Sequence, residues 1–152
     1  MWAPTSSAEV DRALAADTLP ETVVFDGKAT LPYPRNPSKN LDIATDVAAF
    51  ANTNGGVLLY GVGEDALGRL TCSTPIPLTD APERIDQIVR MGVAEVPTIE
   101  VRSLPFAPGA ADGYRAVIIP PYPSLALHAA HGRRGRRASL LWAERHGQLQ
   151  DG

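Results

Sequence analysis

The chain has little cysteine, few aromatic residues and no long apolar run. Cys72 is the single cysteine among 152 residues, so an internal disulfide and a cysteine-based zinc site are both excluded. Such cysteine usage is typical of a reducing compartment, and we expect a cytoplasmic protein. No run of about 18 apolar residues occurs, and residues 1–7 lack a basic region followed by an apolar one, so we expect neither a signal peptide nor a membrane partner.

An excess of positive charge is also missing, since the formal net charge is −3. Domains that bind nucleic acid are often basic overall, so the total charge does not favour this function. The arginines are nevertheless concentrated late in the chain, at Arg133, Arg134, Arg136, Arg137 and Arg145. Arginine forks match phosphate oxygens and clustered cations release counterions, so this cluster predicts a contact with a phosphate backbone. The alternative is a solvated loop, because glycines interrupt and flank the cluster.

Nucleotide-binding motifs are absent or incomplete. No G-x-x-x-x-G-K-[ST] loop occurs, which argues against ATP hydrolysis of the P-loop kind. Residues 61–66 fit G-x-G-x-x-A, but this fingerprint requires a helix immediately after it, and Gly68 and the residues that follow do not permit one. We therefore expect no nicotinamide or flavin cofactor. The three histidines, His128, His131 and His146, are not spaced as in a typical metal site.

The most distinctive segment in the chain is residues 41–62. Apolar residues recur at helical spacing from 41 to 51 and make one apolar face about 100° wide. Residues 52–56, Asn-Thr-Asn-Gly-Gly, tolerate left-handed backbone and predict the end of the helix and a tight turn. The apolar run 57–60 then predicts a buried strand. The residues that we expect to shape the turn are Asn52, Thr53, Gly55 and Gly56.

The rest of the pattern predicts short helices and strands in one domain, a size that suits 152 residues. We expect helices near residues 7–14 and 81–91, and strands at 22–25, near 70, at 98–104, at 114–119 and at 140–143. A proline-punctuated loop is expected between the strand near 70 and the second of these helices. Ser6 or Ser7 is expected to cap the first helix. The strands at 98–104 and 114–119 predict a hairpin. This order implies an α/β (α+β) fold, a single domain with a mixed β-sheet flanked by helices.

Three blocks of the sequence carry a family resemblance. Residues 50–62, FANTNGGVLLYGV, resemble the signature of the Schlafen-type, AlbA-like DNA-binding domain family, an apolar helix followed by F-x-N-T-x-G-G, a strand and G-V. Residues 21–28 resemble the opening strand of that family, in which a Glu precedes a second acid and a Lys. Residues 140–147 are similar to its closing strand. The resemblance implies a mixed sheet and a nucleic-acid-binding domain at 21–147, between an N-terminal helix and lead-in at 1–20 and a tail at 148–152.

The resemblance also implies a set of carboxylates. In Schlafen-type ribonucleases three carboxylates and a divalent ion cleave RNA. The matching acids here are Glu21, Asp26 and either Glu64 or Asp65, and the implied metal ligands are Glu21, Asp26 and Glu64. Mg²⁺ or Mn²⁺ suits such oxygen ligands and relieves the repulsion between converging carboxylates. Lys28 would then contact a phosphate.

This chain departs from the family pattern near these acids. Asp26 is shorter than the usual Glu, Gly27 replaces an aromatic residue, and Gly63 stands where an acid often follows G-V. Residues five apart on a regular strand also face opposite ways, so Glu21 and Asp26 converge only if the strand bends near 25–27, as Gly27 permits. The alternative interpretation is that these acids are ordinary exposed carboxylates at strand ends.

We therefore favour a nucleic-acid-binding domain, for DNA or RNA, within a regulatory module or a larger assembly. One alternative is a divalent-metal-dependent endoribonuclease that acts on structured RNA. Another is a protein interaction module, which would show an exposed apolar patch or an unpaired edge strand.

Overall fold

The computed structural model describes residues 1–19, 24–31, 37–79, 83–92 and 98–122, and for 37–41 only the backbone. Its helices are α1 (Ser7–Ala15), α2 (Pro37–Ala51) and α3 (Glu83–Gly92). Its strands are β1 (Phe25–Lys28), β2 (Gly56–Tyr60), β3 (Val62–Glu64), β4 (Leu70–Ser73), β5 (Ile76–Pro77), β6 (Glu100–Pro105) and β7 (Asp112–Ile119). None of the helices in these ranges is long and apolar enough to cross a membrane.

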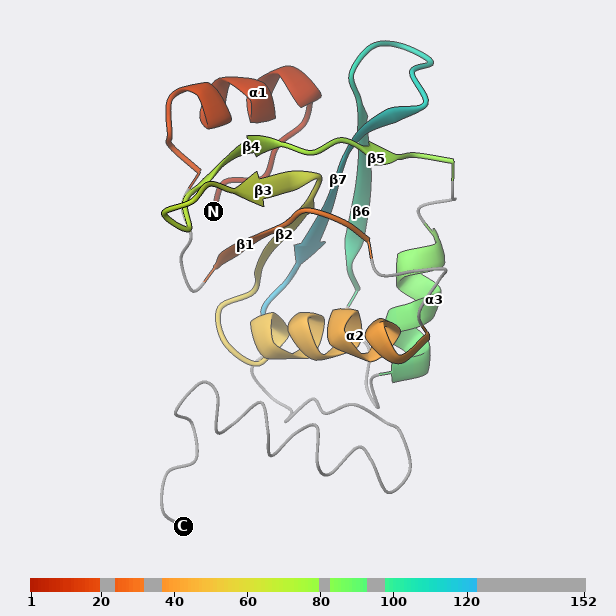
Figure 1. The fold of residues 1–152 in the computed structure, drawn as a ribbon. Helices are drawn as coiled ribbons and strands as arrows, with labels where there is room; N and C mark the ends of the chain where they lie inside the picture. Colours follow the sequence, from red (N-terminus) through yellow and green to blue (C-terminus); the bar gives the residue numbers. More distant parts are fainter. Residues whose placement is uncertain (20–23, 32–36, 80–82, 93–97, 123–152) are drawn as a thin grey trace.

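Within the described residues five strands form the main sheet, and β3 pairs with β4 in a separate hairpin (Figure 1). β1 pairs in parallel with β2, and α2 provides the crossover that a parallel pair requires. β2 runs antiparallel to β7, which also pairs with β5 and β6. The sheet is therefore mixed, and β1 is joined to it through β2.

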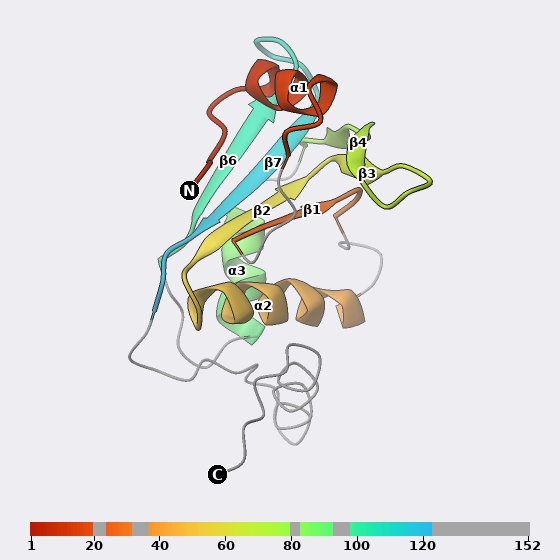
Figure 2. The same ribbon diagram turned by 90° about the vertical axis from the view of Figure 1, so that its left-hand side faces the viewer.

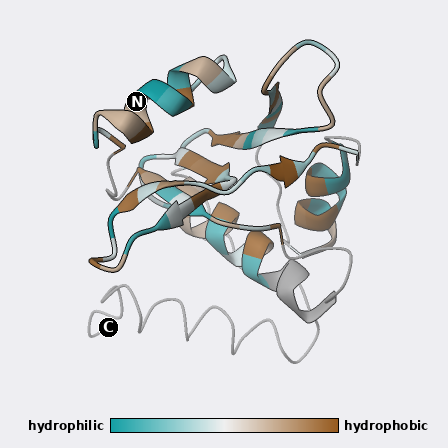
Figure 3. Cartoon of the chain, turned by 45° about the horizontal axis from the view of Figure 1, so that its top comes forward, coloured by the Kyte–Doolittle hydropathy of each residue, from teal (hydrophilic) through white to brown (hydrophobic). Residues whose placement is uncertain are grey.

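The first face of the sheet packs against α2 and α3. Alternate residues of β2, Leu58 and Tyr60, lie in one buried cluster with Val117 and Ile119 of β7. The α2 residues in this cluster are Ile43, Ala44, Val47, Ala48 and Ala51, and the α3 residues are Ile85, Ile88 and Val89. Figure 3 shows apolar and polar residues alternating along α3, as expected for a helix with one buried side.

The second face of the sheet is covered by α1 and by the β3–β4 hairpin. The intervening residues of β2, Val57 and Leu59, pack there with Val10 and Leu14 of α1. In two views at right angles α1 lies across the sheet from α2 (Figures 1 and 2). Strand residues alternate between faces, so the two apolar clusters lie on opposite sides of one sheet.

Polar contacts hold α1 in place. The Tyr114 hydroxyl of β7 donates to Asp11 Oδ1 at 2.6 Å and lies 2.6 Å from Ser73 Oγ of β4. Ser7 Oγ donates to the Pro105 carbonyl at 2.9 Å. The helix begins as its sequence predicts, because the Ser6 side chain accepts a hydrogen bond from the Glu9 N–H. These hydrogen bonds join α1 directly to β6 and β7, and Tyr114 is also in contact with β4.

Most of the expected elements are confirmed. The α/β class, the mixed sheet, the helix that ends before Asn52, the buried strand after it and the β6–β7 hairpin all occur. The expected strand at 140–143 lies outside the described residues. The segment 61–66 is followed by β4, so the helix that the dinucleotide fingerprint requires does not follow it.

Two local expectations are wrong. The first strand continues to Lys28, beyond its expected end at residue 25, because the backbone of Asp26, Gly27 and Lys28 pairs in register with β2, and residues 22 and 23 lie outside the described residues. The expected loop between the strand near 70 and α3 contains β5, which pairs with the start of β7. In both places pairing with a distant strand overrides weak local strand propensity.

Gly27 serves packing, and no bend occurs at its position. The register of β1 with β2 is continuous from Phe25 to Lys28. A Cβ on Gly27 would lie 2.6 Å from Leu70 Cδ1 and 2.7 Å from Val62 Cγ2, so the β3–β4 hairpin packs directly on its backbone. A bend that brings Glu21 to the face of Asp26 would have to occur before Phe25, and Glu21 lies outside the described residues.

Candidate functional site

Asp26 and Lys28 lie on the face of β1 that is turned toward α2. Their parallel neighbours on β2 are Leu58 and Tyr60, which belong to the cluster beneath α2. Lys28 Nζ lies 3.0 Å from Asp26 Oδ2. Asp26, a predicted site carboxylate, is therefore paired with Lys28, the predicted phosphate-binding lysine.

Asp46 of α2 completes this group, and the sequence motifs did not single it out. Its Oδ2 lies 3.6 Å from Lys28 Nζ. An Asp within a helix otherwise rich in buried alanine, valine and isoleucine is a signal that could have identified it, because a partly buried carboxylate requires a partner. We call Asp26, Lys28 and Asp46 the lysine cluster.

Burial and charge act against each other in the lysine cluster. Burial raises the pKa of Asp46 above its usual value, Lys28 lowers it, and the carboxylates of Asp26 and Asp42 raise it further. For Lys28 burial is the largest single effect and lowers the pKa, but Asp46 and Asp26 together outweigh it, so the pKa of Lys28 is raised. The ammonium is thus stabilised in its charged form by the two carboxylates.

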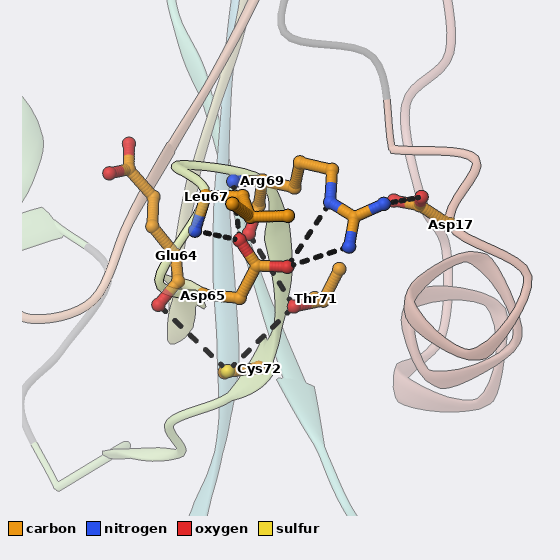
Figure 4. A network of polar contacts seen from close by, with 7 residues as sticks. All are labelled: Asp17, Glu64, Asp65, Leu67, Arg69, Thr71 and Cys72. Atoms are coloured by element: carbon orange, nitrogen blue, oxygen red, sulfur yellow. Dashed lines mark hydrogen bonds and ion pairs between the residues drawn. The ribbon is translucent and has the colours of Figure 1, made fainter.

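The third predicted acid position lies in the β3–β4 hairpin. Asp65 Oδ1 accepts hydrogen bonds from the backbone N–H of Leu67 at 2.9 Å and of Arg69 at 3.0 Å, and Oδ2 accepts from Arg69 Nε at 3.2 Å (Figure 4). These bonds, first that from the Arg69 backbone, lower the pKa of Asp65. The carboxylate of Glu64 points away from this network in Figure 4. Asp65 therefore shapes the turn, while Glu64 is exposed.

Two of the predicted metal ligands lie in the described part of the chain, Asp26 on β1 and Glu64 at the end of β3. Within that part no three His, Cys, Asp or Glu residues are placed to share a metal ion. Asp26 faces α2 and pairs with Lys28, whereas Asp65 is bonded within the turn of the hairpin. The metal-site prediction therefore depends on Glu21, which lies outside the described residues.

The turn after α2 is shaped by glycine and threonine. Gly55 has φ +72°, and its N–H donates to the Phe50 carbonyl at 2.8 Å. The Thr53 hydroxyl donates to the carbonyls of Ala49 and Phe50. Asn52 continues the helix by donating its N–H to Ala48 at 2.9 Å. At Gly56 a Cβ would lie 2.3 Å from the Phe50 ring, so this glycine is required for close packing and not for positive φ.

The basic side chains of the described chain are largely engaged. Arg69 pairs with Asp65 and Asp17, Arg90 with Asp86, and Arg102 with Glu100. Arg115 is fully buried in β7, and its Nη2 donates to Ser103 Oγ at 3.3 Å. The predicted phosphate-binding arginines, Arg133, Arg134, Arg136, Arg137 and Arg145, all lie outside the described residues.

Comparisons with known proteins identify a family. Residues 21–127 match the family model described as Schlafen, AlbA_2. No curated protein is significantly similar to the chain. A similar solved structure is the crystal structure of the DIP2311 protein from Corynebacterium diphtheriae, with 21% identity and a TM-score of 0.47 over 80% of this chain. The matched region covers only 23% of the length of the DIP2311 chain.

Proposed function

Because the chain belongs to the Schlafen AlbA_2 family, we propose that it is a nucleic-acid-binding domain that contacts the phosphate backbone of DNA or RNA. The family match over residues 21–127 carries this proposal, because the fold agrees with it and two of the three sequence blocks, 21–28 and 50–62, lie within it. The partner is a polyanion, so cationic side chains must supply most of the affinity.

The distribution of charge indicates where the contact would be made. Residues 1–122 contain nine Lys and Arg against fifteen Asp and Glu, a net charge of −6, whereas residues 123–152 contain five against two, a net charge of +3. Many of the cations in the first part are also paired with carboxylates. A phosphate backbone would therefore be repelled by the first part and attracted by the arginines of the second.

The arginine cluster is the first target for a test. Replacement of Arg133, Arg134, Arg136 and Arg137 by Ala should weaken binding to single-stranded RNA, duplex DNA and transfer RNA. The log–log salt slope should flatten by up to about 3 units, since each phosphate contact contributes about 0.7 to 0.9. Titrations at several salt concentrations measure both quantities.

A matched control for this variant removes two exposed arginines of α3. The double variant Arg84→Ala, Arg90→Ala removes the same kind of side chain from a different surface. For each charge removed, it should change nucleic-acid affinity and salt slope much less than the quadruple variant does. Equal affinity and equal salt slope for wild type and the quadruple variant would show that the binding site does not include these arginines.

The endoribonuclease alternative makes a separate prediction. If Glu21 joins Asp26 and Glu64 around a divalent ion, cleavage of a structured RNA should require Mg²⁺ or Mn²⁺ and stop with EDTA. Glu21→Gln should abolish cleavage but keep binding, because it removes a metal ligand and also a charge that repels phosphate. If wild type shows no metal-dependent cleavage, this alternative is excluded and the binding function stands alone.

For the protein interaction alternative, the described residues offer an edge strand, because β1 pairs only with β2, but their exposed apolar side chains are scattered. The large apolar side chains exposed in the described chain are Met1, Leu67, Met91 and Phe106. They belong to four different segments, and apolar residues scattered in this way are normal on a protein surface.

A further inference from the structure

Lys28 is held by carboxylates from two different elements. Asp26 is on the same strand, two residues away and on the same face, and Asp46 reaches it from α2. The other face of β1 is used for packing, since Phe25 is buried in the second cluster and Gly27 lies against Leu70. The Lys28 ammonium therefore lies between β1 and α2.

The carboxylates of the lysine cluster outnumber its ammonium. When all three groups are ionised, two negative charges surround one positive charge, and Asp42 lies one helical turn before Asp46. A phosphate that approaches Lys28 therefore meets a net negative field. The ammonium has three N–H donors and two carboxylate partners, but the net negative field favours a phosphate contact only when one of these carboxylates moves away.

Such an exchange is accessible from solvent. The side chains of Lys28, Asp26 and Asp46 are 41%, 35% and 29% exposed. Salt bridges with this exposure are weak and exchange readily. The Asp46 contact, at 3.6 Å, is the longer of the two and is the one that we expect to open first.

We propose that Asp46 is a positioning residue that holds Lys28 between β1 and α2 and competes with a nucleic-acid phosphate for its ammonium. The identity of the competing ligand rests on the proposed nucleic-acid binding. When a phosphate binds, it replaces Asp46 as a partner of Lys28, while Asp26 keeps the ammonium on the strand. Asp46 thereby lowers the affinity of the site.

The central experiment uses Asp46→Asn in the full chain. This change keeps the shape of the side chain and removes its charge. Nucleic-acid affinity should rise about two- to fivefold, the range of an exposed ion pair. The salt slope should steepen by up to about 0.7 to 0.9, because the phosphate contact of Lys28 forms only partly in wild type against the competition of Asp46 and forms fully in the variant. Asp46→Glu restores a carboxylate and should return both values toward wild type.

Two further variants separate competition from a general charge effect. Asp86→Asn removes the same charge and frees Arg90 on α3, so it should change affinity and slope much less. In a Lys28→Met background Asp46→Asn should have no more effect than Asp86→Asn. If Asp46→Asn and Asp86→Asn have equal effects in the wild-type background, the competition is overturned.

Carbodiimide cross-linking tests the geometry without nucleic acid. The reagent joins a carboxylate to an adjacent amine, so mass spectrometry should detect Lys28 linked to Asp46 and to Asp26. Added RNA should reduce the link to Asp46 more than the link to Asp26. The absence of both links would overturn the geometry. If the links form but wild type binds no nucleic acid, then the proposed function and the competition both fail, and Asp46 serves only to hold β1.

Discussion

Replacement of Gly55 by Val is expected to lower the free energy of unfolding by about 3 to 5 kcal/mol, because two separate costs add at this position. The first is the backbone, since φ at Gly55 is +72° and a β-branched residue is strongly disfavoured there. The second is space, since a Cβ would lie 2.5 Å from the Ile119 carbonyl oxygen and 2.8 Å from the Pro121 nitrogen. Urea unfolding measures the loss.

Gly68 provides a matched control for this prediction. Its φ is +76°, and a Cβ would meet nothing within 4 Å. Gly68→Val should therefore incur only the backbone cost of about 1 to 2 kcal/mol. The difference in free energy of unfolding between the two variants measures the steric cost of adding a side chain where β7 lies close to the turn. Equal losses of stability would contradict the packing that we describe around Gly55.

Replacement of Val10 by Asp is expected to be as damaging, with a loss of about 3 to 5 kcal/mol, because it buries a carboxylate in an apolar cluster. Val10 is fully buried against the second face of the sheet. Ala8→Asp is the matched control, because it places the same side chain on the exposed side of α1 and near the helix N-terminus, where a negative charge is favourable. Thermal and urea unfolding compare the two.

The result for Val10 also locates the start of the folding unit. The family match begins at residue 21, and we propose that the stable domain nevertheless includes α1. The buried Val10 and Leu14 and the Tyr114 to Asp11 hydrogen bond support this boundary. If Val10→Asp is no more destabilising than Ala8→Asp, α1 is an accessory segment and the domain begins after it.

The lysine cluster gives two residues that the family resemblance singled out partners other than those expected. Asp26 was expected to bind metal and Lys28 to bind phosphate, but in the described chain each is the other's partner. The metal role of Asp26 would require a metal ion to displace Lys28, and the phosphate role of Lys28 would require a phosphate to displace a carboxylate. The Asp46 variants test the second exchange, and the Glu21 variant tests metal-dependent cleavage.

The sequence alone determined the features that depend on neighbouring residues. The helix of α2 follows from apolar residues at helical spacing, and the cap of α1 follows from Ser6. The left-handed turn follows from glycine at position 55, since glycine adopts positive φ without strain. The family resemblance also follows from this local segment, because its signature spans the helix, the turn and the next strand.

Only the tertiary structure decided the features that depend on residues far apart in the chain. The extent of β1, the existence of β5 and the need for glycine at position 27 come from strand pairing and hairpin packing. The contact between Lys28 and Asp46 joins residues on two elements, whose meeting is set by the register of β1 and by the packing of α2. Local preferences specify which backbone conformation a segment adopts, but pairing and burial specify which side chains meet. The charge partners at the candidate site are therefore a property of the folded domain.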